Sequence, residues 1–299
     1  DAGKDNFIVY PVPQNNPLSK SGNHLQVTGI CEDEADKNIL WISSFDGLYQ
    51  FNKKTKTFFF IDADYPLQEN GAPLKTFLCM EQSPGSLFMG TWFAGLVRYD
   101  KQTNSFHRIA KLVDGKPAYN YGTLDIQLYA DSLLYLACMN QGLLSYNINS
   151  QIISEKLTQK DVPQLNAQIN IQRVSIAGSS GFFAGGNAAV YQLPVQGNRF
   201  GNNYFYQVPE IYPGQENHFT AVQYDAIRNC YWATCSNFAG VIAYNEDFSL
   251  LKLYPSTNKK QIFEELALDK KGRLWVIDRL RKMQYLETVS GKFISADSI

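Results

Sequence analysis

The side chains whose ordinary pKa lies closest to neutral pH are those of three histidines, His24, His107 and His218. None belongs to an HxH or HExxH pattern, so no zinc-binding spacing is present. The sequence also lacks the G-x-S-x-G nucleophile motif and a phosphate-binding glycine loop. Its 28 Asp and Glu residues allow many carboxylate pairs, but no spacing singles one out. We therefore predict no catalytic residue, no metal and no cofactor, and we expect that the domain is not an enzyme.

Residues suited to binding a polar ligand occur instead in short segments between apolar stretches. Large aromatic side chains in turns can stack on the apolar face of a sugar, and neutral amides can exchange hydrogen bonds with hydroxyls. Arginine can hold a carboxylate or sulfate through forked hydrogen bonds. The predicted ligand-binding set consists of the aromatics Phe45, Trp92 and Phe238, the amides Asn140, Gln141, Asn187 and Asn237, and the charged residues Asp46, Arg279 and Arg281.

The five cysteines do not form a recognisable metal or disulfide pattern. Their number is odd, they are scattered over predicted strands, and no CxxC pair exists. Cys230 and Cys235 lie at opposite ends of one predicted strand, too far apart to bond each other. We expect buried thiols that act as small apolar side chains, although one bridge stays open as an alternative in an exported protein.

The elements that carry the candidate residues repeat along the chain. Between Gly85 and Ile109, runs of alternating apolar and polar residues are separated by turn residues, which is typical of half-buried strands. Another such run, Thr76–Gln82, precedes them, so the whole stretch predicts a meander of four strands. A single meander cannot bury both of its faces, and it therefore needs neighbouring copies.

Five further copies follow from three aligned positions. A bulky residue in the second strand recurs every 43 to 49 residues, a glycine usually opens the third strand, and an aromatic residue or leucine follows four residues later. The bulky residues are Trp41, Phe88, Tyr135, Phe183, Trp232 and Trp275; the glycine position holds Gly47, Gly95, Gly142, Ala189, Gly240 and Lys282; and the last position holds Phe51, Tyr99, Tyr146, Leu193, Tyr244 and Leu286.

This periodicity predicts an all-β fold, a β-propeller of four-stranded antiparallel blades. Six blades are counted, and a seventh that is split between the termini remains an alternative. Residues 1–26 are expected to supply a strand that closes the ring and an entering loop. The six repeats cover about 27–75, 76–122, 123–169, 170–218, 219–261 and 262–299, all in one domain.

Most of the candidate residues lie in the loops between second and third strands. In a propeller these loops share one face with the loops that enter each first strand, around a central funnel. They differ between copies while the flanking positions repeat, as expected of a site built on a constant scaffold. Two alternatives stay open, because Trp92 could cap a neighbouring blade and Arg281 could pair with Asp278. The long entering loops add Tyr65, Tyr119, Tyr121 and Tyr212.

Several repeats share a longer motif. It is carried by Asp269, Gly272, Leu274, Trp275 and Val276 in the last copy and by Leu40, Trp41, Ile42, Gly47, Leu48, Phe51 and Asn52 in the first. The pattern resembles the two-component-regulator propeller repeat over nearly the whole chain. The resemblance implies the periplasmic sensor region of a hybrid two-component system or histidine kinase of the Bacteroidetes type. It further implies a small ligand, often a glycan fragment, and the remaining domains of a larger parent chain as partners.

Composition argues against nucleic-acid binding and against a membrane-spanning helix. With 27 Lys and Arg against 28 Asp and Glu, the formal charge of −1 offers no basic surface for nucleic acid. No apolar run reaches the roughly 18 residues of a membrane helix. The chain starts at DAGKDNF without a visible signal peptide, so we expect either a removed leader or, preferably, a fragment of a longer protein.

Three functions are compatible with these observations. The first is an extracytoplasmic sensor that binds a small molecule or oligosaccharide on the funnel face. The second is a protein–protein interaction scaffold, which could form a homodimer. The third, ranked below both, is a metal-dependent propeller lactonase or lyase, for which Asp46, Asn187 and Asn237 would offer oxygen ligands.

Overall fold

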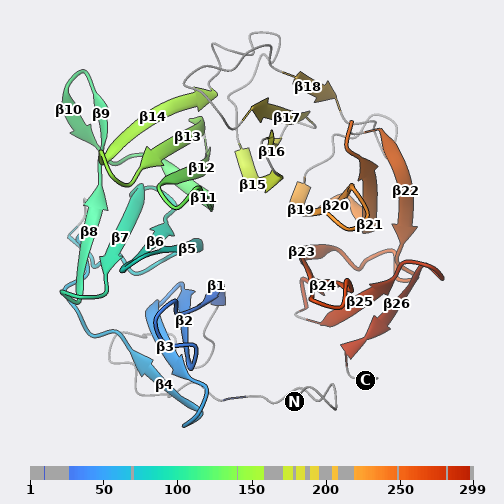
Figure 1. Cartoon of the computed structure of the whole chain (residues 1–299), viewed down its shortest axis with the longest axis horizontal. Coiled ribbons are helices and arrows are strands. Elements are labelled where there is room, and N and C mark those ends of the chain that lie inside the picture. Colours follow the sequence, from blue (N-terminus) through green and yellow to red (C-terminus); the bar gives the residue numbers. More distant parts are fainter. Residues whose placement is uncertain are drawn as a thin grey trace. The chain divides into compact units, whose positions relative to one another are not determined.

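The computed structural model describes residues 10, 27–68, 71–139, 141–157, 171–177, 180–185, 189–194, 204–207, 219–247, 249–280 and 282–296. Its regular structure is β throughout (Figure 1). Six four-stranded antiparallel sheets follow one another along the chain, and in each sheet the strands pair in sequence order. The predicted fold class, an all-β propeller of four-stranded blades, is confirmed. In the described part, no helix is long and apolar enough to cross a membrane.

The described strands fall into two compact units, which we treat separately: β1–β14 in one and β15–β26 in the other. The first unit contains three blades and a small hairpin. Its strands are β1 (Val27–Glu32), β2 (Ile39–Ser44), β3 (Gly47–Asn52), β4 (Thr57–Phe60), β5 (Cys79–Ser83), β6 (Ser86–Gly90), β7 (Leu96–Asp100), β8 (Ser105–Ile109), β9 (Lys111–Val113), β10 (Lys116–Ala118), β11 (Gly122–Tyr129), β12 (Leu133–Met139), β13 (Gly142–Asn147) and β14 (Ile152–Leu157).

The second unit contains the other three blades. Its strands are β15 (Ile171–Ala177), β16 (Ser180–Gly185), β17 (Ala189–Pro194), β18 (Tyr204–Gln207), β19 (Phe219–Asp225), β20 (Cys230–Cys235), β21 (Phe238–Asn245), β22 (Leu250–Pro255), β23 (Phe263–Leu268), β24 (Leu274–Asp278), β25 (Met283–Glu287) and β26 (Lys292–Ser295).

The core lies between neighbouring blades. One apolar cluster joins Trp41 and Leu48 of the first blade to Met89 and Val97 of the second. Another joins Phe88 of the second blade to the third, and in the other unit a third cluster joins the fifth and sixth blades. The repeated bulky residues are buried at Trp41, Phe88, Tyr135 and Trp232, whereas Trp275 is half-buried.

A buried tyrosine holds the start of the third strand in the first two blades. The hydroxyl of Tyr65 accepts a hydrogen bond from the N–H of Leu48 at 3.1 Å and donates one to the carbonyl of Ile61 at 3.1 Å. Tyr121 makes the same pair of bonds in the second blade, to Leu96 at 3.2 Å and Ile109 at 2.7 Å. Burial raises the pKa of both phenols above the ordinary 10.0, so both remain protonated and can donate.

The glycine that opens the third strand makes room for this tyrosine. Gly95 has a φ of +75°, and a Cβ there would lie 2.6 Å from the ring of Tyr121. Gly47 has a φ of +130°, and its Cβ would lie 2.8 Å from the hydroxyl of Tyr65. In these two blades the repeated glycine is therefore required both by backbone conformation and by a close tyrosine contact.

A carboxylate holds the turn between first and second strands in three blades. One carboxylate oxygen accepts the indole N–H of the repeated tryptophan and a side-chain cation, and the other accepts two backbone N–H groups of the turn. The tryptophan–aspartate pairs are Trp41–Asp33 at 2.6 Å, Trp232–Asp225 at 3.0 Å and Trp275–Asp269 at 2.9 Å, with Lys101, Arg228 and Arg273 as the cations.

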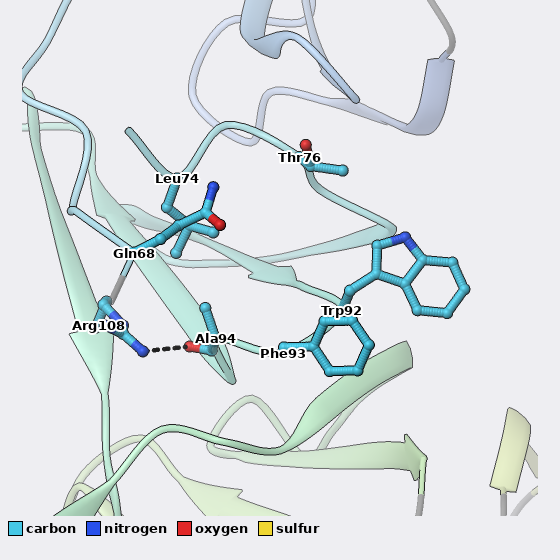
Figure 2. A pocket seen from close by; sticks show the side chains of 7 residues that line it. All are labelled: Gln68, Leu74, Thr76, Trp92, Phe93, Ala94 and Arg108. Carbon is cyan, nitrogen blue, oxygen red and sulfur yellow. Dashed lines mark hydrogen bonds between the residues drawn. The ribbon is translucent and has the colours of Figure 1, made fainter. Parts of the chain in front are cut away.

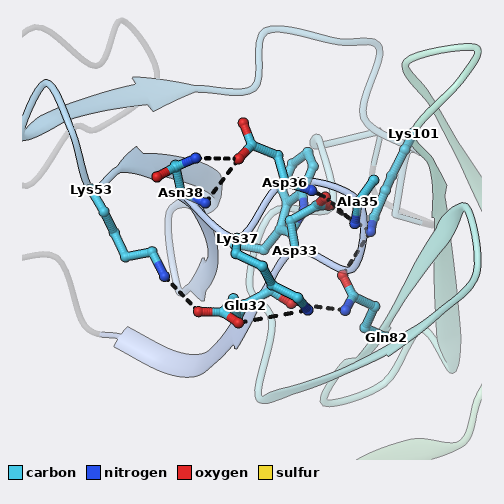
Figure 3. A network of polar contacts seen from close by, with 10 residues as sticks. Glu32, Asp33, Ala35, Asp36, Lys37, Asn38, Lys53, Gln82 and Lys101 are labelled. Carbon is cyan, nitrogen blue, oxygen red and sulfur yellow. Dashed lines mark hydrogen bonds and ion pairs between the residues drawn. The ribbon is translucent and has the colours of Figure 1, made fainter.

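In the first blade this arrangement extends to the next blade (Figure 3). Lys101, which follows β7, reaches Asp33 at 2.8 Å and Gln82 at 2.7 Å, and Gln82 donates to the carbonyl of Glu32 at 2.9 Å. Burial alone would raise the pKa of Asp33, but the hydrogen bonds from Lys101 and Trp41 lower it well below the ordinary 3.8. The turn motif thus also joins neighbouring blades.

One entering segment differs from its prediction, and another lies almost wholly outside the described residues. The segment 111–122, expected to be a loop, contains the hairpin β9–β10 beside β8 and β14 (Figure 1). Its turn residues Asp114 and Gly115 both have positive φ, at 50° and 73°, and Asp-Gly is a strong hairpin signal that the loop assignment overlooked. The predicted closing strand in residues 1–26 lies outside the described residues, except for Tyr10, whose ring contacts Phe51 at 5.0 Å.

We predict that Gly95→Ala destabilises the protein more than Gly85→Ala. Both glycines have similar φ, +75° and +72°, but a Cβ at Gly85 meets nothing within 4 Å. The backbone penalty of about 1–2 kcal/mol is therefore shared, and the clash with Tyr121 adds about 1–3 kcal/mol only at Gly95. Urea unfolding measures both values, and equal losses would contradict the proposed role of the tyrosine.

We also predict that Asp225→Asn lowers the free energy of unfolding by about 2–3 kcal/mol at pH 7, because charged hydrogen bonds from Trp232 and Arg228 are lost. Burial opposes ionisation of Asp225, but these bonds lower its pKa below 3.8. Its stabilisation is therefore complete above pH 3.8 and declines as the pH falls through the folded-state pKa.

The difference between wild type and Asp225→Asn should accordingly shrink below pH 3.8. Asp114→Asn, in the exposed β9–β10 turn, serves as control and should change stability by less than about 0.5 kcal/mol. Chemical unfolding between pH 2.5 and 7 tests this, and a difference that persists unchanged at the lowest pH would count against the carboxylate's role.

Candidate functional site

The loop between β6 and β7 carries the most exposed aromatic pair of the described loops. Trp92 is 44% exposed and Phe93 is 73% exposed, and their ring centroids lie 6.3 Å apart. They border a pocket of about 440 Å³, here called the Trp92 pocket (Figure 2). Its other lining residues are Gln68, Leu74, Thr76, Ala94 and Arg108.

Local hydrogen bonds hold this loop in shape. The hydroxyl of Thr91 donates to the carbonyl of Gly95 at 2.8 Å and accepts from the N–H of Ala94 at 3.0 Å. The N–H of Gly95 bonds the carbonyl of Tyr121 at 2.9 Å. The backbone on either side of Trp92 and Phe93 is therefore fixed, while both rings remain accessible.

Arg108, on the outer strand β8, supplies the positive charge of the pocket. Its guanidinium donates to the carbonyls of Leu67 at 3.2 Å and Ala94 at 3.5 Å, the latter seen in Figure 2. It also lies 4.1 Å from the ring centroid of Tyr119. Packing on an aromatic ring and bonding to two carbonyls orient the guanidinium before any ligand arrives.

Polar groups from the segment before β5 complete the pocket. The hydroxyl of Thr76 donates to the carbonyl of Phe45 at 3.2 Å, and the amide of Gln68 donates to the carbonyl of Pro73 at 3.3 Å. A hydroxyl, an amide, a guanidinium and two aromatic rings thus face one hollow. Such a set can stack on a ring and bond its hydroxyls, as small-molecule pockets commonly do.

The structure places four of the predicted ligand residues of the first unit. Trp92 lines the pocket, and Phe45, 38% exposed, adjoins it through the bond from Thr76. The N–H of Asp46 donates to the hydroxyl of Ser44 at 3.0 Å within its turn. The amide oxygen of Gln141 accepts from Lys111 at 3.1 Å. Asn140 lies outside the described residues.

In the second unit, one placement is wrong. Phe238 was predicted in a loop, but it begins β21, is only 5% exposed and packs in a cluster with Phe219 and Tyr244. Its ring therefore fills the core instead of facing a ligand. Asn237, beside it, is half-buried. Arg279 is exposed and pairs with Glu264 at 3.4 Å. Asn187 and Arg281 lie outside the described residues.

Among the tyrosines of the entering loops, Tyr65 and Tyr121 are 8% and 1% exposed and belong to the core, not to an open face. Tyr119 supports Arg108, and Tyr212 lies outside the described residues. Of the histidines, only His107 is described; it is exposed and bonds the hydroxyl of Ser105 at 3.0 Å. No three His, Cys, Asp or Glu side chains of the described segments gather as metal ligands would.

All five cysteines are free thiols, and four of them are buried as expected. Burial raises the pKa of Cys138 to about 12 and that of Cys230 to about 11. Cys31, which is half-buried, has its pKa raised by burial to about 12. Thiols with such pKa values remain protonated at neutral pH and are unreactive.

Of the seven residues that line the Trp92 pocket, only Trp92 was predicted from the sequence. The polar, charged and aromatic residues among the other six are Gln68, Thr76, Phe93 and Arg108. Phe93 stands next to Trp92 in the same loop, and two adjacent aromatics in a turn were a usable signal. Arg108 lies in the outer strand, where a charged residue is ordinary. Gln68 belongs to an entering segment from which only Tyr65 stood out. Thr76 was expected to begin a strand, but β5 begins at Cys79.

Comparison with known proteins relates this fold to bacterial receptors. No protein-family model matches the sequence, and no curated protein matches it. The extracellular domain of the proposed hybrid two-component system BT3049 from B. thetaiotaomicron superposes with a TM-score of 0.67 at 16% identity, over 91% of this chain and 35% of that chain. The corresponding domain of BT4673 from the same organism superposes with a TM-score of 0.60 at 12% identity, over 84% of this chain and 32% of that chain. The computationally designed protein Ika8 superposes with a TM-score of 0.57 at 12% identity, over 92% of this chain and 76% of that chain.

We predict that the strand residue Phe238 and the loop residue Trp92 differ sharply in their effect on stability. Phe238→Ala should cost about 3–5 kcal/mol, because it empties a buried position, whereas Trp92→Ala should cost less than about 1 kcal/mol. Thermal or urea unfolding of the two variants provides the measurement. A large loss for Trp92→Ala would mean that its ring is a structural cap on a neighbouring blade.

At 12–16% sequence identity, the similarity to these three solved structures establishes a shared β-propeller fold and nothing finer. The chain spans about a third of the length of the two bacterial extracellular domains. By its architecture, this chain is therefore a β-propeller similar to part of the extracellular region of hybrid two-component systems.

Proposed function

We propose that this chain is a ligand-sensing propeller from the extracytoplasmic, periplasmic part of a two-component receptor, and that it binds an oligosaccharide at the Trp92 pocket. The observation that carries the proposal is the exposed pair of aromatic rings above a hollow lined by polar groups. The shared fold with extracellular domains of two-component systems supports the receptor assignment.

The chemistry of the pocket favours a sugar. Pyranose rings have an apolar face that stacks on an indole, and their hydroxyls need neutral donors and acceptors. Trp92 and Phe93 offer the stacking surface, and Gln68 and Thr76 offer the polar groups. Arg108 would add affinity for a sugar that carries a carboxylate or sulfate.

The signal would pass through further parts of a longer parent chain. The similar bacterial domains are about three times as long as the matched region, which leaves room for such parts. Ligand binding would change contacts between this propeller and its neighbours, and binding itself requires no catalytic group in this domain.

A second candidate, a protein-docking surface, is favoured by the apolar exposure around the same loop. Leu67 is 58% exposed and Phe93 73% exposed, and both lie beside the Trp92 pocket. Aromatic residues at a rim of this kind are also typical of protein interfaces. A concentration-dependent dimer with no response to sugars would favour this function.

The test is a thermal-shift screen against neutral, uronic and sulfated oligosaccharides, followed by calorimetric titration of any that stabilise the protein. A ligand at a hundredfold excess over its dissociation constant adds about 2.7 kcal/mol of stability. We expect Trp92→Ala to weaken binding about tenfold, because a stacking contact is worth about 1.4 kcal/mol.

Phe59→Ala provides the matched control, because Phe59 is a comparably exposed aromatic, at 53% against 44% for Trp92, but lies on β4 and does not line the pocket. It should leave the affinity unchanged. If no oligosaccharide stabilises the protein, or if Trp92→Ala binds as tightly as wild type, the proposed site is wrong.

A further inference from the structure

A second pocket, here called the outer pocket, is lined by residues of the second and third blades and of the strand β9. Its volume is about 350 Å³, and its wall includes Arg98, His107, Ile109, Leu112, Tyr146 and Gln151. No Asp or Glu is among its lining residues. It was not anticipated from the sequence, since its residues come from two repeats and individually occupy ordinary strand or turn positions.

The register of the second blade brings its basic residues together. Arg98 on β7 pairs directly with His107 on β8, so both side chains leave the same face of the sheet. Across from them, Tyr146 on β13 packs against Phe88, with ring centroids 5.8 Å apart. Burial raises the pKa of Tyr146 above 10.0 although the charge of Arg98 lowers it, so the phenol remains a donor at neutral pH.

The guanidinium of Arg98 is incompletely bonded. Its Nε atom is buried and has no hydrogen-bond acceptor among the described residues. Its Nη2 atom forms an ion pair with a carboxylate oxygen of Asp100 at 3.6 Å, a distance too long for a good hydrogen bond. The other oxygen of Asp100 already accepts the N–H groups of Gln102 and Thr103.

Arg108 also borders the outer pocket, and its guanidinium is likewise incompletely hydrogen-bonded. The Nε atom of Arg108 is also buried without an acceptor in the described part of the chain. Its terminal nitrogens bond Leu67 and Ala94 on the side of the Trp92 pocket. Buried donors without acceptors cost about 1–3 kcal/mol each, and native proteins rarely leave them so.

We propose that the outer pocket binds a single oxyanionic group, a sulfate or a carboxylate, with Arg98 as its principal ligand. The anion accepts from the guanidinium of Arg98 at one end, and His107 and Tyr146 border it. Ile109 and Leu112 form an apolar wall that can carry the remainder of the molecule to which the anion belongs. The site is separate from the proposed sugar site, since only Arg108 lines both pockets.

The experiment is calorimetric titration of the whole chain with sodium sulfate and, separately, sodium acetate, at constant ionic strength in chloride buffer. We expect saturable binding of one anion per chain. Arg98→Met, which retains the apolar stem, should weaken it at least tenfold. Lys116→Met, which removes one exposed positive charge from the nearby hairpin and does not line the pocket, should change it less than twofold.

Because Arg98 is partly buried, its variant could be unstable, and unfolding in the absence of anion is measured alongside. His107→Gln gives a second test, since His107 is exposed on an outer strand, and it should weaken binding two- to fivefold. Preference for one of the two anions identifies its shape and supports the proposal. The proposal is overturned if neither sulfate nor acetate binds saturably. It is also overturned if Arg98→Met and His107→Gln bind the anion as tightly as wild type, because the arginines would then be hydrated only.

Discussion

A four-stranded antiparallel blade has two apolar faces, and neither can be left in water. In each unit, neighbouring blades therefore pack against each other, so that the side chains of alternate strand positions fill a shared core. Val97 and Tyr99 pack toward the first blade, whereas Phe88 and Leu96 on the other face pack toward the third. Burial of apolar area is the main source of stability, and here it requires neighbouring copies.

Packing of this kind tolerates few errors in strand position, because a shift by one residue exchanges the two faces. The hydrogen bonds at the strand ends fix that position. Tyr65 and Tyr121 bond residues at the start of third strands, and the aspartates beside the repeated tryptophans hold the turns into second strands. Because these groups maintain the register, the loops between them can vary without loss of the fold. Trp92 and Phe93 stand in one such loop.

The repeat period was sufficient to predict most of the strands. Several boundaries agree with the structure to the residue, as at Gly47–Asn52 and Gly142–Asn147. Others differ by a few residues, such as β5, which begins at Cys79 instead of Thr76. The tyrosine contacts were not predictable in the same way. Tyr65 and Tyr121 occur in polar segments of unlike sequence, and only the folded chain shows that each ring covers a glycine of its own repeat.

The candidate site was predictable only in part, for the same reason. Trp92 was identified because a large aromatic in a turn is unusual, but Arg108 and Gln68 reach the same pocket from positions that carry no signal in the sequence. The outer pocket is a stronger example. Its residues come from β7, β8, β9, β13 and the turn after β13, and no spacing along the chain relates them.

The sequence by itself determined the architecture: alternation of apolar residues set the strands, and the recurrence of three positions set the blades. The tertiary structure decided which loop residues are available to a ligand. Phe238 and Trp92 were both predicted in loops between a second and a third strand, yet Phe238 begins β21 and is 5% exposed, whereas Trp92 is in a loop and is 44% exposed. The difference depends on whether neighbouring side chains close over the ring, and those neighbours are distant in sequence. Burial is a property of the packed chain, so it could not be read from either residue alone.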